Sequence, residues 1–135
     1  MSRHTILLTQ ADAPYFQWPI INPDGQKIVD VVTGGDEAGI YAAQIAGGQE
    51  VGDELFIRLH FNINAPNGQA IKLAGISMED RSVPNFVING NDSGVALGIT
   101  KDNDASKVPI AIFLKSTGRD WLVVSHTRGI ELVTL

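Results

Sequence analysis

The feature that most constrains the fold is a stretch at residues 53–64 in which apolar and other side chains alternate. Every second residue from Leu55 to Ile63 is apolar, and most residues between them are polar or charged. A period of two is that of a β-strand, whose successive side chains point to opposite faces of a sheet. This segment therefore predicts a strand with one face in a hydrophobic core.

Residues 107–115 repeat the alternation, with an apolar residue at every second position from Val108 to Leu114. Pro109 lies inside this segment and has no N–H to donate to a neighbouring strand. We therefore expect a strand that lies at a sheet edge or contains a bulge.

The rest of the chain favours the same class of structure. Val, Ile and Thr, which are enriched in strands, number 33 of the 135 residues, and 14 Gly and 6 Pro divide the chain into short segments. Further strands are predicted at 4–9, 15–21, 27–33, 69–76, 83–88, 94–100, 120–126 and 129–134. The sequence thus predicts one all-β domain over residues 1–135, a β-sandwich or jelly roll of about ten short strands.

Two turn sequences predict how neighbouring strands connect. Residues 22–25 are Asn-Pro-Asp-Gly and residues 66–68 are Pro-Asn-Gly, and both are typical of β-hairpins. Residues 36–46 allow two interpretations. Asp36 and Glu37 could begin a helix, whereas Gly39 and the flanking glycine pairs favour a strand, which is our prediction.

Composition excludes several classes of protein. The absence of cysteine excludes disulfide frameworks, cysteine-ligated metal sites and thiol nucleophiles. The net charge of −5 comes from residues 1–68, which carry 3 basic and 8 acidic side chains, whereas residues 69–135 carry 7 of each. Because the basic residues are scattered among acids, we expect no nucleic-acid partner.

Membrane insertion and secretion are not expected either. The apolar runs are far shorter than the roughly 20 residues that a membrane helix needs. The first residues, Met-Ser-Arg-His followed by three apolar residues, lack the apolar core of a signal peptide. We therefore expect synthesis in the cytoplasm without a signal peptide.

No catalytic motif stands out. His4, His60 and His126 are far apart and have no ligand-pair spacing, and a serine triad built on His126 would lack a nucleophile elbow. Strands could still bring the histidines together, so a small β-sandwich or cupin-like enzyme stays an alternative. The sequence predicts a non-enzymatic protein with no cofactor and no bound metal.

Two other patterns favour a lectin-like module as the main alternative. Asn91, Asp92, Asp102 and Asp104 place side-chain oxygens on either side of one short strand, as a calcium or sugar site would need. Asx-rich turns explain the same residues without an ion. Trp18 and Trp121 could stack on a sugar ring, although both could equally lie in the core.

Phe56 and Phe113 indicate an interaction surface. Each lies on the otherwise polar face of an alternating strand, where a large apolar residue implies a second packed layer or an interface. We predict that they anchor a homo-oligomer or a contact with a larger protein assembly.

Residues 89–118 resemble a known family. They contain a Gly-x-Ala-x-Gly-Ile strand at 94–99, an Asp-containing loop at 102–104 and an apolar strand ending near Gly118. This order is similar to the central part of tailed-phage head decoration proteins, over 30 of the 135 positions and without the family's Pro/Ala/Thr-rich N-terminal arm. The 94–99 strand is also similar to fimbrial subunits, which need a signal peptide and often a disulfide. The resemblance to decoration proteins implies a virion structural component that binds a capsid.

Overall fold

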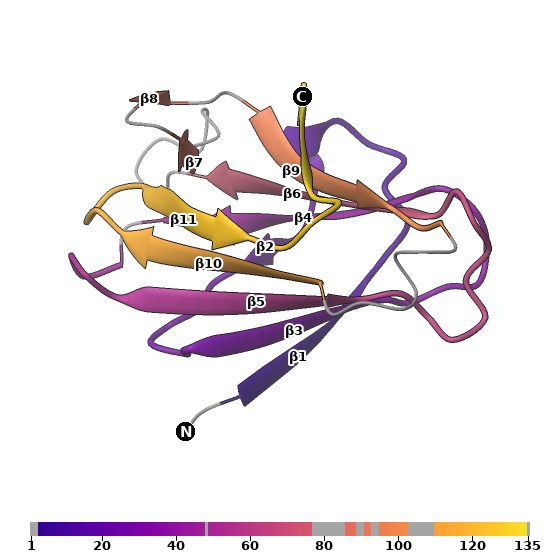
Figure 1. The fold of residues 1–135 in the computed structure, drawn as a ribbon, viewed down its shortest axis with the longest axis horizontal. Coiled ribbons are helices and arrows are strands. Elements are labelled where there is room, and N and C mark those ends of the chain that lie inside the picture. Colours follow the sequence, from indigo (N-terminus) through magenta and orange to yellow (C-terminus); the bar gives the residue numbers. More distant parts are fainter. Residues whose placement is uncertain are drawn as a thin grey trace.

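In the computed structural model, which describes residues 3–47, 49–76, 86–88, 91–92, 95–102 and 110–134, two β-sheets pack face to face (Figure 1). The first, sheet A, has seven strands in the order β1-β3-β5-β10-β11-β7-β8. Its strands are β1 Arg3–Leu8, β3 Ile28–Thr33, β5 Glu54–His60, β7 Phe86–Ile88, β8 Asn91–Asp92, β10 Ile110–Ser116 and β11 Trp121–His126. The predicted β-sandwich is confirmed.

The second, sheet B, has five strands in the order β12-β9-β6-β4-β2. Its strands are β2 Ile20–Ile21, β4 Ile40–Ala46, β6 Ala70–Ile76, β9 Val95–Thr100 and β12 Glu131–Thr134. The strand predicted within residues 36–46 is thereby confirmed as β4. The interpretation of this segment as a helix is wrong.

The first six strands alternate between the two sheets. From β3 to β6, each strand pairs in parallel with the strand two steps earlier in the chain. β1, β3 and β5 are parallel neighbours in sheet A, and β2, β4 and β6 are parallel neighbours in sheet B. The jelly roll, which is built from antiparallel strands, is therefore wrong for this chain.

The two predicted hairpins are also wrong, although the turns form. Asp24 and Gly25 have φ angles of 46° and 81°, and the Gln26 N–H donates to the Pro23 carbonyl at 2.8 Å, closing a tight turn. The turn carries the chain from β2 of sheet B to β3 of sheet A, and residues 66–68 likewise lie between β5 and β6. Turn residues specify a local reversal, whereas the core faces of the flanking strands decide which sheet each joins.

Prolines explain two further differences. The strand predicted at 15–21 is wrong over residues 15–17, which form the short 3-10 helix η1 (Tyr15–Gln17) between Pro14 and Pro19. Pro109 lies outside the described residues, and β10 begins after it at Ile110. β10 is an interior strand, so the expected edge position is wrong, but a bulge does interrupt its pairing with β11 at Phe113 and Leu114.

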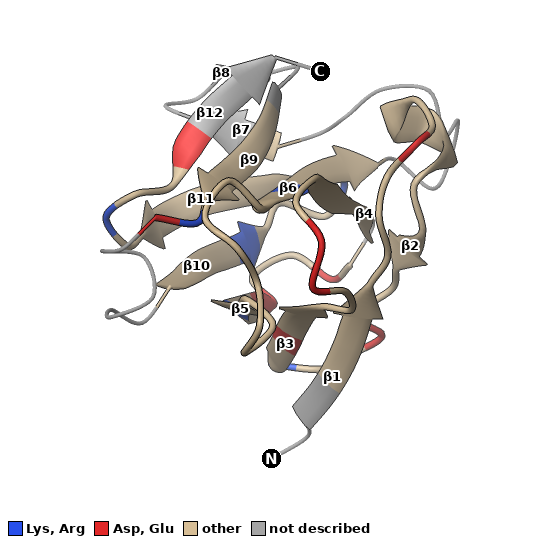
Figure 2. Ribbon diagram, turned by 90° about the vertical axis from the view of Figure 1, so that its right-hand side faces the viewer, with Lys and Arg blue, Asp and Glu red and all other residues tan. Residues whose placement is uncertain are grey.

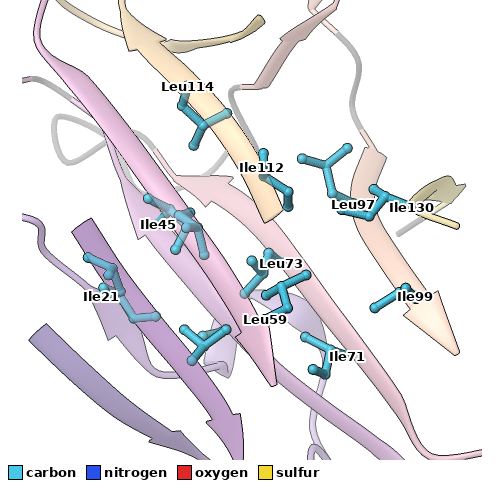
Figure 3. Packing of buried hydrophobic residues seen from close by; sticks show 14 of the residues in the cluster. Ile21, Ile45, Leu59, Ile71, Leu73, Leu97, Ile99, Ile112, Leu114 and Ile130 are labelled. Atoms are coloured by element: carbon cyan, nitrogen blue, oxygen red, sulfur yellow. The ribbon is translucent and has the colours of Figure 1, made fainter. Parts of the chain in front are cut away.

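The core lies between the sheets, where side chains from both interdigitate (Figure 3). The apolar face predicted for residues 53–64 supplies Leu55, Ile57 and Leu59, all buried. Trp121, only 1% exposed, is the largest core side chain, and its Nε1–H donates to the Ala46 carbonyl at 2.9 Å. This hydrogen bond joins β11 of sheet A to the end of β4 in sheet B.

Candidate functional site

The outer face of sheet A, turned away from the core, carries the two phenylalanines that the sequence singles out. Phe56 on β5 and Phe113 on β10 lie directly opposite each other across the antiparallel pair. Their ring centroids are 6.5 Å apart with planes tilted by 55°, and Phe56 is 37% exposed. The structure thus brings the two predicted interface residues into one aromatic pair at the centre of the sheet.

Other apolar side chains extend this pair across the sheet. Ile28 on β3 lies opposite Phe56, and Leu7 on β1 lies opposite Val32 on β3. Leu7 is 69% exposed, and Ile28 and Val32 are half-buried. On the other side of the pair, β11 adds half-buried Leu122 and exposed Val124. We call the outer face of β1, β3, β5, β10 and β11 the open face.

A charged cluster that the sequence analysis missed lies within the open face. The Arg58 Nε–H and Nη2–H donate to the two carboxylate oxygens of Asp30 at 2.6 and 2.8 Å. The His60 Nε2 lies 3.0 Å from the same Oδ1. Asp30 points away from the core yet its side chain is only 4% exposed, whereas that of His60 is 48% exposed. The sequence did contain a sign of this cluster. Asp30 is the one charged residue within the otherwise apolar segment Ile28–Val32.

Register explains how the cluster forms. Asp30 lies opposite Arg58 in the parallel pairing of β3 with β5, and His60 is two residues further along the same face of β5. A planar guanidinium matches the two oxygens of a carboxylate, so this pairing is bidentate. The hydrogen bonds that Arg58 donates to Asp30, and secondarily the charge of Asp30, raise the pKa of Arg58 above its ordinary value, although desolvation lowers it. Arg58 therefore stays charged and neutralises the covered carboxylate.

Charge is balanced on the three central strands of the open face, in contrast to the chain as a whole. β3, β5 and β10 present two acids and two bases there, because Asp30 pairs with Arg58, and Glu54 lies opposite Lys115. Most acidic residues of the described chain instead lie in loops, and Figure 2 shows red segments in several loops as well as on β3 and β12. The net charge of −5 is thus carried mainly away from this face.

The outer face of sheet B has the opposite character. Many of its side chains are small, and the following are buried: Ala42, Gln44, Ala46, Ala74, Ile76 and Ala96. Lys72 is half-buried, and Ile20 and Ile40 are exposed. The Gln44 Nε2–H donates to the Trp18 carbonyl at 2.9 Å, so the segment around η1 packs on this face. The part of this face around Gln44 is therefore covered.

The aromatic platform predicted from Trp18 and Trp121 is wrong for Trp121 and stays a prediction for Trp18. Trp121 belongs to the core, because a ring of this size fills the space between the sheets. Trp18 is half-buried, its Nε1–H donates to the Ala13 carbonyl at 3.0 Å, and its ring packs edge-on against Tyr15 at 6.5 Å. The two indoles therefore present no shared stacking surface.

The predicted calcium or sugar ligands are only partly described. Asn91 and Asp92 form β8 at the far edge of sheet A, where nothing is described of their side chains, and Asp104 lies outside the described residues. Asp102 is exposed just after β9. Within the described part of the chain, no three His, Asp or Glu residues are grouped as metal ligands would be. His60 and His126 lie on β5 and β11, with β10 between them.

A small cavity lies where the turn before β3 meets the loop before β5. It measures about 80 Å³ and is lined by polar groups including Gln26, Gln49 and Asp53, and by Trp121. Binding sites for small organic ligands usually enclose about 300–1,000 Å³. This cavity is therefore too small for a sugar.

Comparison with protein-family models, with curated proteins and with solved structures gives no match. None of the helical segments in the described residues has the length and apolarity that crossing a membrane would require. The function is therefore argued from the geometry of the open face.

Proposed function

We propose that this chain is a non-enzymatic structural protein that assembles with copies of itself through the open face of sheet A. The observation that carries the proposal is the Phe56–Phe113 pair, which lies partly exposed at the centre of a five-strand surface. Large aromatic side chains near the centre of a surface are the residues that most often dominate binding energy. Two such faces can pack as the two sheets of a sandwich do, about 10 Å apart.

The size of the open face suits a specific contact. Five adjacent strands of about six residues span about 20 by 24 Å, or roughly 500 Å² on each copy. Two copies would together bury on the order of 1,000 Å², which is the lower limit for a stable interface. Because both copies would use the same face, the contact would have two-fold symmetry.

Charge favours a second copy as the partner. Two chains of net charge −5 repel each other wherever their acidic loops meet, and a face with equal numbers of acids and bases lowers that repulsion. The Asp30–Arg58 pair also brings no unpaired charge into the contact. A virion component, such as a capsid decoration protein, is the narrower form of this proposal and follows from the resemblance at residues 89–118.

The test is the mass of the protein by light scattering after size-exclusion chromatography, over a dilution series. We expect the wild type to exceed its chain mass of 14.5 kDa. The double variant Phe56→Ser/Phe113→Ser should stay folded by circular dichroism and have a smaller assembled mass than the wild type, because it loses the contact through the open face. The matched control is Val51→Ser/Ile63→Ser, since both residues are highly exposed but lie in loops away from the open face.

Two results would contradict the proposal. One is a wild type that stays monomeric at every concentration. The other is a folded phenylalanine double variant that retains the wild-type mass, which would assign any association to another surface.

A further inference from the structure

The free edge of β1 is a second surface with an unusual combination of properties. β1 is the last strand on its side of sheet A, and Figure 1 shows no strand beyond it. An edge strand offers a row of unpaired N–H and C=O groups to any extended chain that can reach it. Natural sheets usually protect such an edge by shortness, proline, charge or a bulge.

The other sheet edges of the described chain are short and carry charge or proline, whereas β1 is longer and has a formal charge only at its first residue, Arg3. β2 and β8 have two residues each, and β12 has four. β2 is followed within two residues by Pro23, β8 contains Asp92 and β12 begins with Glu131. β1 has six residues, and its last four, Thr5–Leu8, contain neither charge nor proline.

Hydrogen bonding shows which backbone groups of β1 point to the open side. The Gly34 N–H donates to the Leu8 carbonyl at 2.8 Å, at the end of the parallel pairing with β3. Within a parallel pair, both backbone groups of one residue point to the same side and successive residues alternate. Leu8 and Ile6 therefore bond to β3, whereas the N–H and C=O groups of Thr5 and Leu7 point outward from the sheet edge.

We infer that β1 pairs antiparallel with β1 of a second copy, which joins the two seven-stranded sheets into one continuous sheet. A two-fold axis beside Ile6 places Thr5 opposite Leu7 of the other copy, and the reverse. These are the residues whose backbone groups point outward, so each such pair exchanges two hydrogen bonds. The side chain of Leu7, 69% exposed, would then lie beside that of Thr5 in the other copy.

The sequence of the strand favours a second copy as the partner over an unrelated chain. In this register Arg3 lies opposite Thr9, so the two copies of the one formal charge in residues 3–9 are not brought together. Like charges placed directly opposite each other would destabilise the pair. The same uncharged segment meets itself, and no complementary sequence is required of another protein.

This contact uses backbone groups at the sheet edge and does not need the open face, so its failure can be told apart from that of the proposed function. The variant Leu7→Pro removes one N–H that points outward, so no hydrogen bond to β3 is lost. Proline is tolerated at an edge-strand position whose N–H faces away from the sheet. The matched control Leu7→Ala shortens the side chain and keeps the N–H. We expect Leu7→Pro to raise the dissociation constant about tenfold or more by sedimentation, with Leu7→Ala much nearer the wild type.

Hydrogen exchange of the wild type tests the same contact without a variant that could misfold. We expect the amides of Thr5 and Leu7 to exchange about tenfold or more slowly in concentrated protein than after dilution to monomer. The amides of Ile6 and Leu8 should be protected in both samples, since they bond to β3. Equal, fast exchange of Thr5 and Leu7 at all concentrations would overturn the inference, as would a monomer at every concentration. Loss of association only in the Phe56→Ser/Phe113→Ser variant would also overturn it and leave the proposed function intact.

Discussion

The two outer faces of the sandwich differ in the size and exposure of their side chains. On sheet B, four alanines and Gln44 are buried almost completely. On sheet A, the corresponding positions carry Phe56, Arg58, His60 and Lys115, which are half-buried or exposed. Small side chains let other segments pack closely on a sheet, whereas large and charged ones keep a face in water. This difference indicates that the outer face of sheet A, and not that of sheet B, is available to a partner.

The covered face is tied to the segment around η1 by specific hydrogen bonds. The Gln44 backbone N–H donates to the Pro19 carbonyl, and its side chain donates to the Trp18 carbonyl, at 2.8 and 2.9 Å. A buried amide side chain is stable only when such bonds form. Gln44 therefore fixes this segment against β4, whereas no segment among the described residues is bound in this way to the outer face of β5.

The largest effect should come from placing one charge on each face. Ala74→Asp puts a carboxylate on the covered face, where a buried and unpaired charge costs several kcal/mol, comparable to a typical total stability of about 5–15 kcal/mol. Val124→Asp puts the same charge on the open face, and we expect a loss of about 1 kcal/mol through strand propensity alone. Circular dichroism and urea denaturation measure both. If Ala74→Asp folded as stably as Val124→Asp, the two faces would be equally exposed and the comparison would fail.

The two tryptophans provide the next largest difference. Trp121 fills the core, so Trp121→Ala should lower the free energy of unfolding by about 3–5 kcal/mol. Trp18 is half-buried beside sheet B, and Trp18→Ala should cost clearly less. Urea denaturation of both variants gives the order. A larger loss for Trp18 would show that the cover of sheet B stabilises the protein more than the core does.

On the open face, Arg58 has a structural role through its bond to Asp30, whereas Lys115, which lies opposite Glu54, does not. Arg58→Ala leaves the covered carboxylate of Asp30 without its bidentate partner, so the melting temperature should fall. Lys115→Ala removes a charge of the same sign from an exposed position of the same face and should leave the melting temperature unchanged. Equal melting temperatures for the two variants would contradict a structural role for the Asp30–Arg58 pair.

The pKa of Arg58 fixes how this difference depends on pH. Because Asp30 raises the pKa of Arg58, the contribution of Arg58 to stability is fully present below the ordinary pKa of an arginine and is lost only as the pH rises through the raised value. The difference in melting temperature between wild type and Arg58→Ala should therefore stay constant between about pH 8 and about pH 10. A difference that disappears within this range would show that the guanidinium is not the group responsible.

Most of the fold could be predicted from periodicity, because alternation along one strand directly reports its two faces. The alternating segment at 53–64 predicted β5, three of its core residues and the position of Phe56. It was wrong beyond His60, where the strand ends and Ile63, expected on the core face, is 96% exposed. The pairing of strands could not be predicted in this way. The turn at 22–25 has hairpin chemistry, yet β2 and β3 join different sheets, since pairing depends on contacts distant in sequence.

In the candidate site too, the residues marked by a local pattern could be predicted, and those brought together by strand pairing could not. Phe56 and Phe113 could be found because each interrupts the polar face of its own strand. The Asp30–Arg58–His60 cluster joins residues about 30 positions apart through the register of β3 with β5, which no local pattern reports. Trp121 was ambiguous for a related reason, because an isolated tryptophan on a strand can face the core or solvent and only the packing decides.

The smallest expected effect concerns the bond that holds the covered face. Gln44→Met keeps a side chain of similar length but removes the donor to the Trp18 carbonyl, so the free energy of unfolding should fall by about 1 kcal/mol. Gln17→Met is the matched control, because Gln17 is exposed on η1 and should tolerate the change. Hydrogen exchange adds a local measurement: in Gln44→Met the Gln44 backbone amide, which bonds to Pro19, should exchange faster than in the wild type. Unchanged exchange would mean that the segment is held on sheet B by its apolar contacts, and the covered face would then depend on its small side chains alone.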